Sequence, residues 1–135
     1  MGRFLRQTWM PTLGFVAVSA TIAAVLLFGY WITAIGLCGL VATPPLWWTL
    51  VARSARPGMG RGAAAGALSG LASYAFPLLL GVISFYTRRD FGLGAMGDVL
   101  FFGIMIGGAV AAAAVNAALG ALLIRVGQRK EAPNV

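Results

Sequence analysis

The sequence predicts an all-α fold, an integral membrane four-helix bundle with short loops. Charged residues make up 10% of the chain and hydrophobic residues 60%, whereas a soluble domain carries roughly 25% charged residues. Three long segments contain no Asp, Glu, Lys or Arg: residues 7–52, 62–87 and 99–124. Small residues recur at helical spacing in the last two segments, which predicts close packing of the third and fourth helices. Four helices would occupy most of the 135 residues, so we expect one transmembrane domain over 1–135.

The first charge-free segment is long enough to cross a bilayer twice. Its 46 residues would extend about 69 Å as one helix, at ~1.5 Å per residue, while a bilayer core is ~30 Å thick. Gly29 relaxes the backbone near the middle, and Tyr30 and Trp31 suit a membrane–water interface. We therefore expect a turn there, a first helix over about 9–28 and a second over about 32–50.

The second helix contains two consecutive prolines, Pro44 and Pro45. Because these residues remove two backbone donors, we expect the helix to kink or stop there. Residues 46–52 would then lie along the cytoplasmic interface, and the alternative is a broken helix that lines a substrate path. Tryptophans suit the headgroup region, and the chain's four are predicted to be interfacial anchors: Trp9, Trp31, Trp47 and Trp48.

The second half of the chain contains two more predicted helices. A polar, basic linker over residues 53–61 precedes the third helix, expected over about 62–86. A glycine-rich connection, 87–97, follows it. Asp98 is expected to begin the fourth helix, over about 98–124, because an acid is favoured at a helix N-terminus.

The basic residues predict that both termini are cytoplasmic. Lys and Arg concentrate in cytoplasmic loops, and with this orientation the outer side holds only Arg88 and Arg89, beside Asp90. The inner side then holds eight basic residues: Arg3, Arg6, Arg53, Arg56, Arg61, Arg125, Arg129 and Lys130. Abundant Ala, Gly and Arg with a single Lys suggest a high-GC bacterial gene. The predicted location is therefore the bacterial cytoplasmic (inner) membrane, crossed several times.

Small residues form stripes on the third and fourth helices. Lipid provides no hydrophobic drive for helix association, so small residues that allow close backbone approach mark helix contacts. The stripe on the third helix comprises Gly62, Gly66, Gly70, Ser73, Pro77, Gly81 and Ser84. That on the fourth comprises Gly103, Gly107, Ala111, Ala114, Ala118 and Ala121, with a second set of Gly108, Ala112, Asn116 and Gly120. We expect these two helices to pack together, with the leftover small face meeting the first helix, a second copy or a partner subunit.

A few polar groups remain open to two interpretations. Asn116 is the most polar side chain deep in any predicted span, and it would either hold helices together by hydrogen bonding or line a solute or ion path. Arg88 and Arg89 would contact phosphate headgroups, or alternatively attract an anionic ligand or an acidic partner loop. The hydroxyl residues of the spans, Ser69 and Ser73 among them, are expected to bond carbonyls of their own helices.

The sequence lacks the usual groups for catalysis, metal binding or ion coupling. It contains no histidine, no carboxylate within a predicted span, no nucleophile–base set and no phosphate-binding loop. We therefore expect no enzyme activity, no metal and no cofactor. The basic residues flank apolar segments instead of forming a stripe, so no nucleic-acid partner is expected. Small multidrug exporters and fluoride channels share this size. The glutamate that the exporters need in their first helix is absent here, and so is the phenylalanine- and threonine-rich filter of the fluoride channels. No family is therefore assigned.

The leading hypothesis is a non-catalytic accessory or assembly subunit of a larger membrane complex, acting through helix–helix contacts within the lipid bilayer. It follows from the many contact-type stripes and the absence of coupling groups. The alternative is a small transporter or channel, formed as a homo-oligomer, with a path near Asn116 and Pro77. A third class, a lipid-perturbing pore former, is supported only by the size of the chain.

Overall fold

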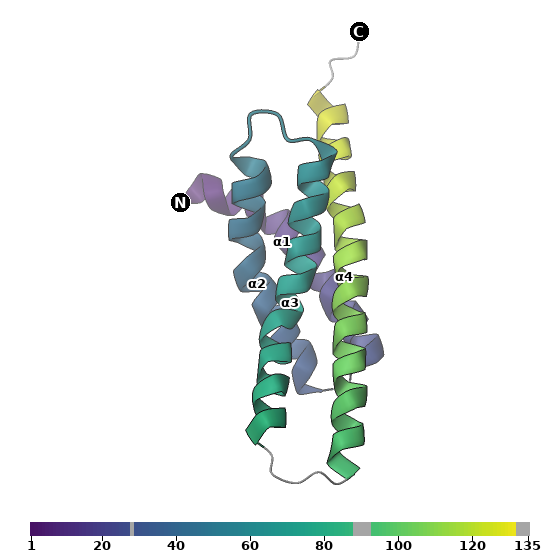
Figure 1. Cartoon of the computed structure of the whole chain (residues 1–135). Coiled ribbons are helices and arrows are strands. Elements are labelled where there is room, and N and C mark those ends of the chain that lie inside the picture. The colour runs from purple at the N-terminus through teal and green to yellow at the C-terminus, as the bar shows by residue number, and fades with distance from the viewer. Residues whose placement is uncertain (28, 88–92, 132–135) are drawn as a thin grey trace.

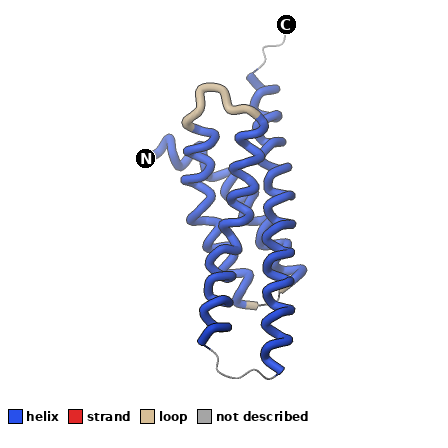
Figure 2. The backbone as a smooth tube through the Cα atoms, in the orientation of Figure 1, coloured by secondary structure: helices blue, strands red, loops and turns tan. Residues whose placement is uncertain are grey.

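The computed structural model describes residues 1–27, 29–87 and 93–131. These residues form helices and no strand (Figure 2). The elements in order are α1 (Gly2–Leu26), α2 (Tyr30–Trp47), the π-helical turn η1 (Trp48–Ala52), α3 (Met59–Thr87) and α4 (Leu93–Glu131). With η1 continuing α2, four helices are long and apolar enough to cross a membrane. The all-α prediction is therefore confirmed, together with the presence of four helices suited to spanning a bilayer.

The helices form an elongated bundle. α2, α3 and α4 run side by side, and α1 crosses obliquely behind them (Figure 1). The start of α1, the α2–α3 loop and the end of α4 lie at one end of the bundle, whereas the end of α3 and the start of α4 lie at the other (Figure 1). We call the first the basic end, because its segments contain Arg3, Arg6, Arg53, Arg56, Arg61, Arg125, Arg129 and Lys130.

The helices at both ends of the chain are longer than the sequence predicts. α1 begins at Gly2, and α4 begins at Leu93, five residues before the predicted start. Asp98 therefore lies inside α4 and does not begin it, which corrects the expectation. The 39 residues of α4 extend about 58 Å, well beyond a ~30 Å bilayer core. Charged residues can therefore belong to the helix while lying outside the hydrocarbon region.

The two prolines of α2 do not end the helix. The backbone N–H of Trp48 donates to the carbonyls of both Pro44 and Pro45, and the N–H of Arg53 donates to the Trp48 carbonyl at 2.9 Å. Beyond the prolines, the bonding pattern widens to a π-helical turn, in which an N–H bonds the carbonyl five residues back. Residues 46–52 consequently continue the bundle toward the basic end, and the expected segment along the interface is not present.

The interior contains two separate hydrophobic clusters. The first, which we call the far cluster, comprises Ala23, Ile35, Tyr74, Met105, Ala109 and Ala112. The second, the basic-end cluster, comprises Phe15, Trp47, Val51, Ala65 and Ile124. Each cluster draws residues from α1, α3 and α4, together with α2 or η1. Both clusters therefore hold the same four-helix arrangement together at different depths.

α3 and α4 approach each other closely enough for their backbones to touch. A Cβ at Gly62 would lie 2.5 Å from the Gly120 carbonyl oxygen, and one at Gly70 would lie 2.7 Å from that of Ala112. Midway between them, a Cβ at Gly66 would overlap the Asn116 carbonyl oxygen. Each step of four residues along α3 is thus matched by a step of four in the opposite direction along α4. Only glycine on α3 permits this antiparallel contact, since any side chain there would meet backbone atoms.

Candidate functional site

A layer of buried polar side chains lies between the two hydrophobic clusters. Along each helix, one or two buried polar residues lie between a residue of one cluster and a residue of the other. On α1, for example, Ser19 lies between Phe15 and Ala23. All four helices contribute to this buried polar layer, which comprises Ser19, Thr43, Ser69, Ser73 and Asn116, each at most 1% exposed.

Two hydrogen bonds organise the buried polar layer. The Asn116 amide nitrogen Nδ2 donates to Ser19 Oγ at 3.0 Å and so joins α4 to α1. Ser73 Oγ donates to the Ser69 carbonyl at 2.9 Å, a bond within α3. A Cβ at Gly39 would lie 2.8 Å from Ser73 Oγ, so the missing side chain on α2 makes room for this hydroxyl. The small residue on α2 thus positions a polar group of α3 at the centre of the bundle.

Several oxygens of this region are buried without a hydrogen-bond partner. They are Thr43 Oγ1, Ser69 Oγ, Asn116 Oδ1 and, at the edge of the far cluster, Tyr74 Oη. A buried polar atom without a partner costs ~1–3 kcal/mol, and lipid provides no alternative partner. These atoms could accept or donate bonds to a water molecule or to a small neutral polar solute. The groups are hydroxyls and an amide, so the layer can hydrogen-bond but contains no charge to bind an ion.

The outward face of α4 is a second surface of interest. At about 100° per residue, this face lies on the side of α4 opposite the buried residues Ala112, Asn116 and Gly120. No heavy atom lies within 4 Å of a Cβ placed at Gly103 or Gly107. The exposed members of this outer face are Gly103, Gly107, Ala111, Ala114 and Ala118. The predicted packing role of Gly103, Gly107 and Ala111 is therefore not realised within the chain, because α3 packs on the second set of small residues.

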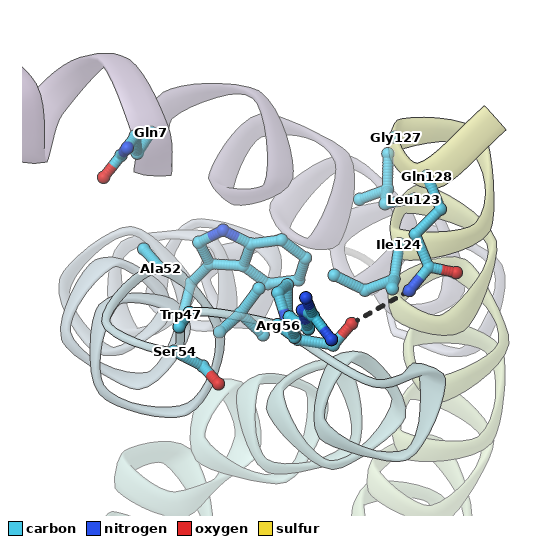
Figure 3. Close-up of a pocket in the computed structure, with 12 residues that line it drawn as sticks. Gln7, Trp47, Ala52, Ser54, Arg56, Leu123, Ile124, Gly127 and Gln128 are labelled. Atoms are coloured by element: carbon cyan, nitrogen blue, oxygen red, sulfur yellow. Dashed lines mark hydrogen bonds between the residues drawn. The ribbon is translucent and has the colours of Figure 1, made fainter. Parts of the chain in front are cut away.

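A cavity of about 770 Å³ lies at the basic end. Residues from α1, α2, η1, the α2–α3 loop and α4 line it (Figure 3). Gln128 Nε2 of α4 donates to the Pro57 carbonyl of the loop at 3.1 Å, across one side of the cavity (Figure 3). Figure 3 also shows the Trp47 indole in the middle of the lining residues. The cavity thus forms where the widened η1 turn, the loop and the last turns of α4 meet.

The four tryptophans occupy different environments. Trp9 is exposed on the second turn of α1, as an interfacial residue should be. Trp31 packs against Phe101, with ring centroids 4.9 Å apart, and Trp48 packs against Phe4 at 5.2 Å. Trp47 is only 7% exposed. Its expected role as an interfacial anchor is corrected, because the continued helix turns its ring into the basic-end cluster.

The remaining predicted residues of α3 lie against different helices. Ser73 is buried beside Gly39 of α2. Gly81 faces the aromatic residues of α4, where a Cβ would lie 2.7 Å from a ring carbon of Phe101. Arg88 and Arg89 lie outside the described residues. The stripe on α3 therefore contacts α4 through its glycines and α2 through Ser73.

Sequence reasoning missed the polar layer as a unit. It singled out Asn116 but expected hydroxyl groups such as Ser69 Oγ to bond their own helix, and it did not consider Thr43. The available signal was a hydroxyl or amide side chain within each apolar helix: Ser19, Thr43, Ser69, Ser73 and Asn116. Only the assembled bundle places these residues at a common depth, because that depth depends on how the four helices are offset along their axes.

Comparison with known proteins adds no relative. No protein-family model, no curated protein and no solved structure matches this chain. The function proposed below therefore depends on the geometry of the chain itself.

Proposed function

We propose that this chain is a multi-pass protein of a bacterial cytoplasmic membrane, with both termini inside, and a non-catalytic accessory or assembly subunit of a larger membrane complex. The observation that carries the proposal is the outer face of α4, where glycine and alanine are exposed on the side opposite α3. Neighbouring transmembrane helices use such faces to approach closely. The eight basic residues of one end support the orientation.

The two faces of α4 support this proposal by their similarity. The inner face already packs against α3 through Ala112, Asn116 and Gly120, where glycines bring the backbones together. The outer face repeats small residues at steps of three or four, although lipid contact alone requires no small side chains. A second transmembrane helix docked there could approach as closely as α3 does on the inner face. The occupant we propose is a helix of a different membrane protein.

Site-specific photocrosslinking in cells tests this proposal. A photoreactive residue at Ala114, on the outer face, should yield an adduct with a distinct membrane protein, whereas one at the exposed Leu37 of α2 should not. Gly107→Leu should remove the adduct by obstructing close approach. Gly36→Leu is the matched control, since nothing lies within 4 Å of a Cβ at either glycine. Equal adducts at Ala114 and Leu37, or no effect of Gly107→Leu, would contradict the proposal.

A second candidate function is favoured by the buried polar layer. The partnerless oxygens of Thr43, Ser69 and Asn116 could form part of a path for a small neutral polar solute, as in a small oligomeric transporter or channel. The test is flux of glycerol or urea into liposomes that contain the purified protein. The candidate predicts an adduct of twice the chain mass from Ala114 and loss of flux in Asn116→Leu. Flux equal to that of empty liposomes would eliminate it.

A further inference from the structure

The cavity at the basic end combines two kinds of lining residue. Its volume of about 770 Å³ falls within the ~300–1,000 Å³ typical of small-molecule sites. The floor consists of buried apolar side chains, Trp47, Val51 and Ile124, each at most 7% exposed. The mouth carries the exposed polar side chains of Gln7, Arg56 and Gln128. A ligand that filled this space would need both an apolar part and a polar part.

The mouth is held in place by hydrogen bonds on two sides. Gln128 Nε2 donates to the Pro57 carbonyl at 3.1 Å, and Arg61 Nη1 donates to Ser54 Oγ at 2.6 Å. Ser54, Arg56 and Pro57 all line the cavity. The loop is therefore tied to α4 on one side and to the start of α3 on the other. Arg56 lies between these two positions, so hydrogen bonds on both sides hold the backbone that carries its guanidinium.

The charge at the mouth is positive and has no acidic neighbour among the lining residues. The residues that line the cavity include Arg56 but no Asp or Glu. Arg61 donates a hydrogen bond to Ser54 of the same loop, and the surrounding segments bring further basic residues to this end. An arginine guanidinium can donate two parallel hydrogen bonds to a phosphate group. The mouth is thus suited to a phosphate-bearing anion.

We propose that this cavity binds the headgroup region of an anionic phospholipid, with the phosphate at Arg56 and the first part of an acyl chain against Trp47. The inference rests on the membrane location proposed above but is independent of any partner of α4. Free phosphate shares the chemistry of the mouth, yet it would leave the apolar floor unoccupied. An amphiphile matches both parts, and anionic lipids concentrate at the cytoplasmic face, where juxtamembrane basic residues attract them.

Native mass spectrometry of the purified full chain in mild detergent tests the inference. The probes are dihexanoyl phosphatidylglycerol, which is anionic, and dihexanoyl phosphatidylcholine, which is zwitterionic. We expect preferential binding of phosphatidylglycerol, and a reduction of about tenfold in Arg56→Gln through loss of the charge-assisted bonds. Arg129→Gln removes the same charge from the same end without altering the lining, and its binding should stay within about twofold of wild type.

A second variant separates shape from charge. Ala55 is exposed and lines the cavity, so Ala55→Trp should obstruct the space while leaving every basic residue in place. We expect it to lose phosphatidylglycerol binding while retaining the helical content and elution volume of the wild type. Retained binding in Ala55→Trp, or an equal loss in Arg129→Gln and Arg56→Gln, would overturn the cavity as the site.

Competition distinguishes the two sources of phosphate. Inorganic phosphate at the same concentration should not displace bound phosphatidylglycerol. Displacement of the bound phosphatidylglycerol by inorganic phosphate would reassign the mouth to free anions and overturn the lipid proposal. A chain that stays in the soluble fraction of cells would instead refute the membrane location. A membrane-inserted chain without lipid preference would refute this inference alone.

Discussion

Gly66→Ala tests the closest contact in the bundle, between α3 and α4. A Cβ at Gly66 would lie 2.5 Å from the carbonyl carbon of Asn116, where ordinary van der Waals contact begins at 3.4 Å, and it would overlap the carbonyl oxygen. The two backbones must therefore separate by more than 0.9 Å at this position, because the carbonyl oxygen is closer still than the carbon. Because backbone cannot rotate away as a side chain can, the added methyl group displaces a whole helix.

The expected loss follows from two opposing effects. Overpacking of a tightly packed interior costs ~1–3 kcal/mol, and the backbone contact places this site near the upper part of that range. Alanine is favoured over glycine within a helix by ~1 kcal/mol, which offsets part of the cost. The net destabilisation should therefore be about 1–2 kcal/mol. At Gly36, where nothing lies within 4 Å of a Cβ, only the favourable effect remains.

The assay is reversible unfolding in mixed micelles with increasing dodecyl sulfate, followed by circular dichroism and tryptophan fluorescence. Gly36→Ala is the matched control and should be as stable as the wild type or more stable. The two variants should differ in free energy of unfolding by about 2–3 kcal/mol. If the free energies of unfolding of Gly66→Ala and Gly36→Ala differ by less than ~0.5 kcal/mol, the ordinary spread for surface positions, the backbone contact does not exist as described.

Three further predictions concern the polar layer and the topology. Asn116→Ala should lower the free energy of unfolding by about 0.5–2 kcal/mol in the same assay, because Ser19 Oγ loses its donor; equal stability would show that the bond contributes nothing. Gly39→Ala should be destabilising, since its Cβ would lie 2.8 Å from Ser73 Oγ, and less so in a Ser73→Ala background; a double-mutant cycle without coupling would contradict that contact. In a Cys38→Ala background, cysteines placed at Ala55 and Thr87 should react with a membrane-impermeant maleimide from opposite sides; labelling from one side would refute the four-span topology.

The helical fold could be predicted because the constraint acts on each segment separately. A charge-free run of known length either can or cannot cross a bilayer, and the residues within 7–52 give two crossings by length alone. Helix ends were less predictable. Asp98 resembles a helix start in sequence, yet α4 begins at Leu93, because a helix that extends beyond the bilayer core can contain charged residues.

The sites were predictable only in part. Gly66 and Gly70 face α4 as the stripe on α3 predicts, since the spacing of small residues defines a face of a helix. The sequence did not determine which face of α4 receives them. α4 has small residues on two opposite faces, and Gly107 belongs to one and Gly108 to the other. Trp47 was assigned to the interface on the expectation that the helix kinks or stops at Pro44 and Pro45. α2 continues through both prolines to Trp47 instead, and the ring packs in the basic-end cluster.

The sequence by itself determined that four apolar helices form, that the start of the first helix and the end of the last share one end of the bundle and that this end is basic. These properties depend on the length of each apolar run and the order of charges along the chain. Only the tertiary structure decided that Ser19, Thr43, Ser69, Ser73 and Asn116 form one buried layer and that a cavity opens at the basic end. The reason is that both features depend on the axial offset and crossing of helices, which arise from side-chain packing between segments distant in sequence.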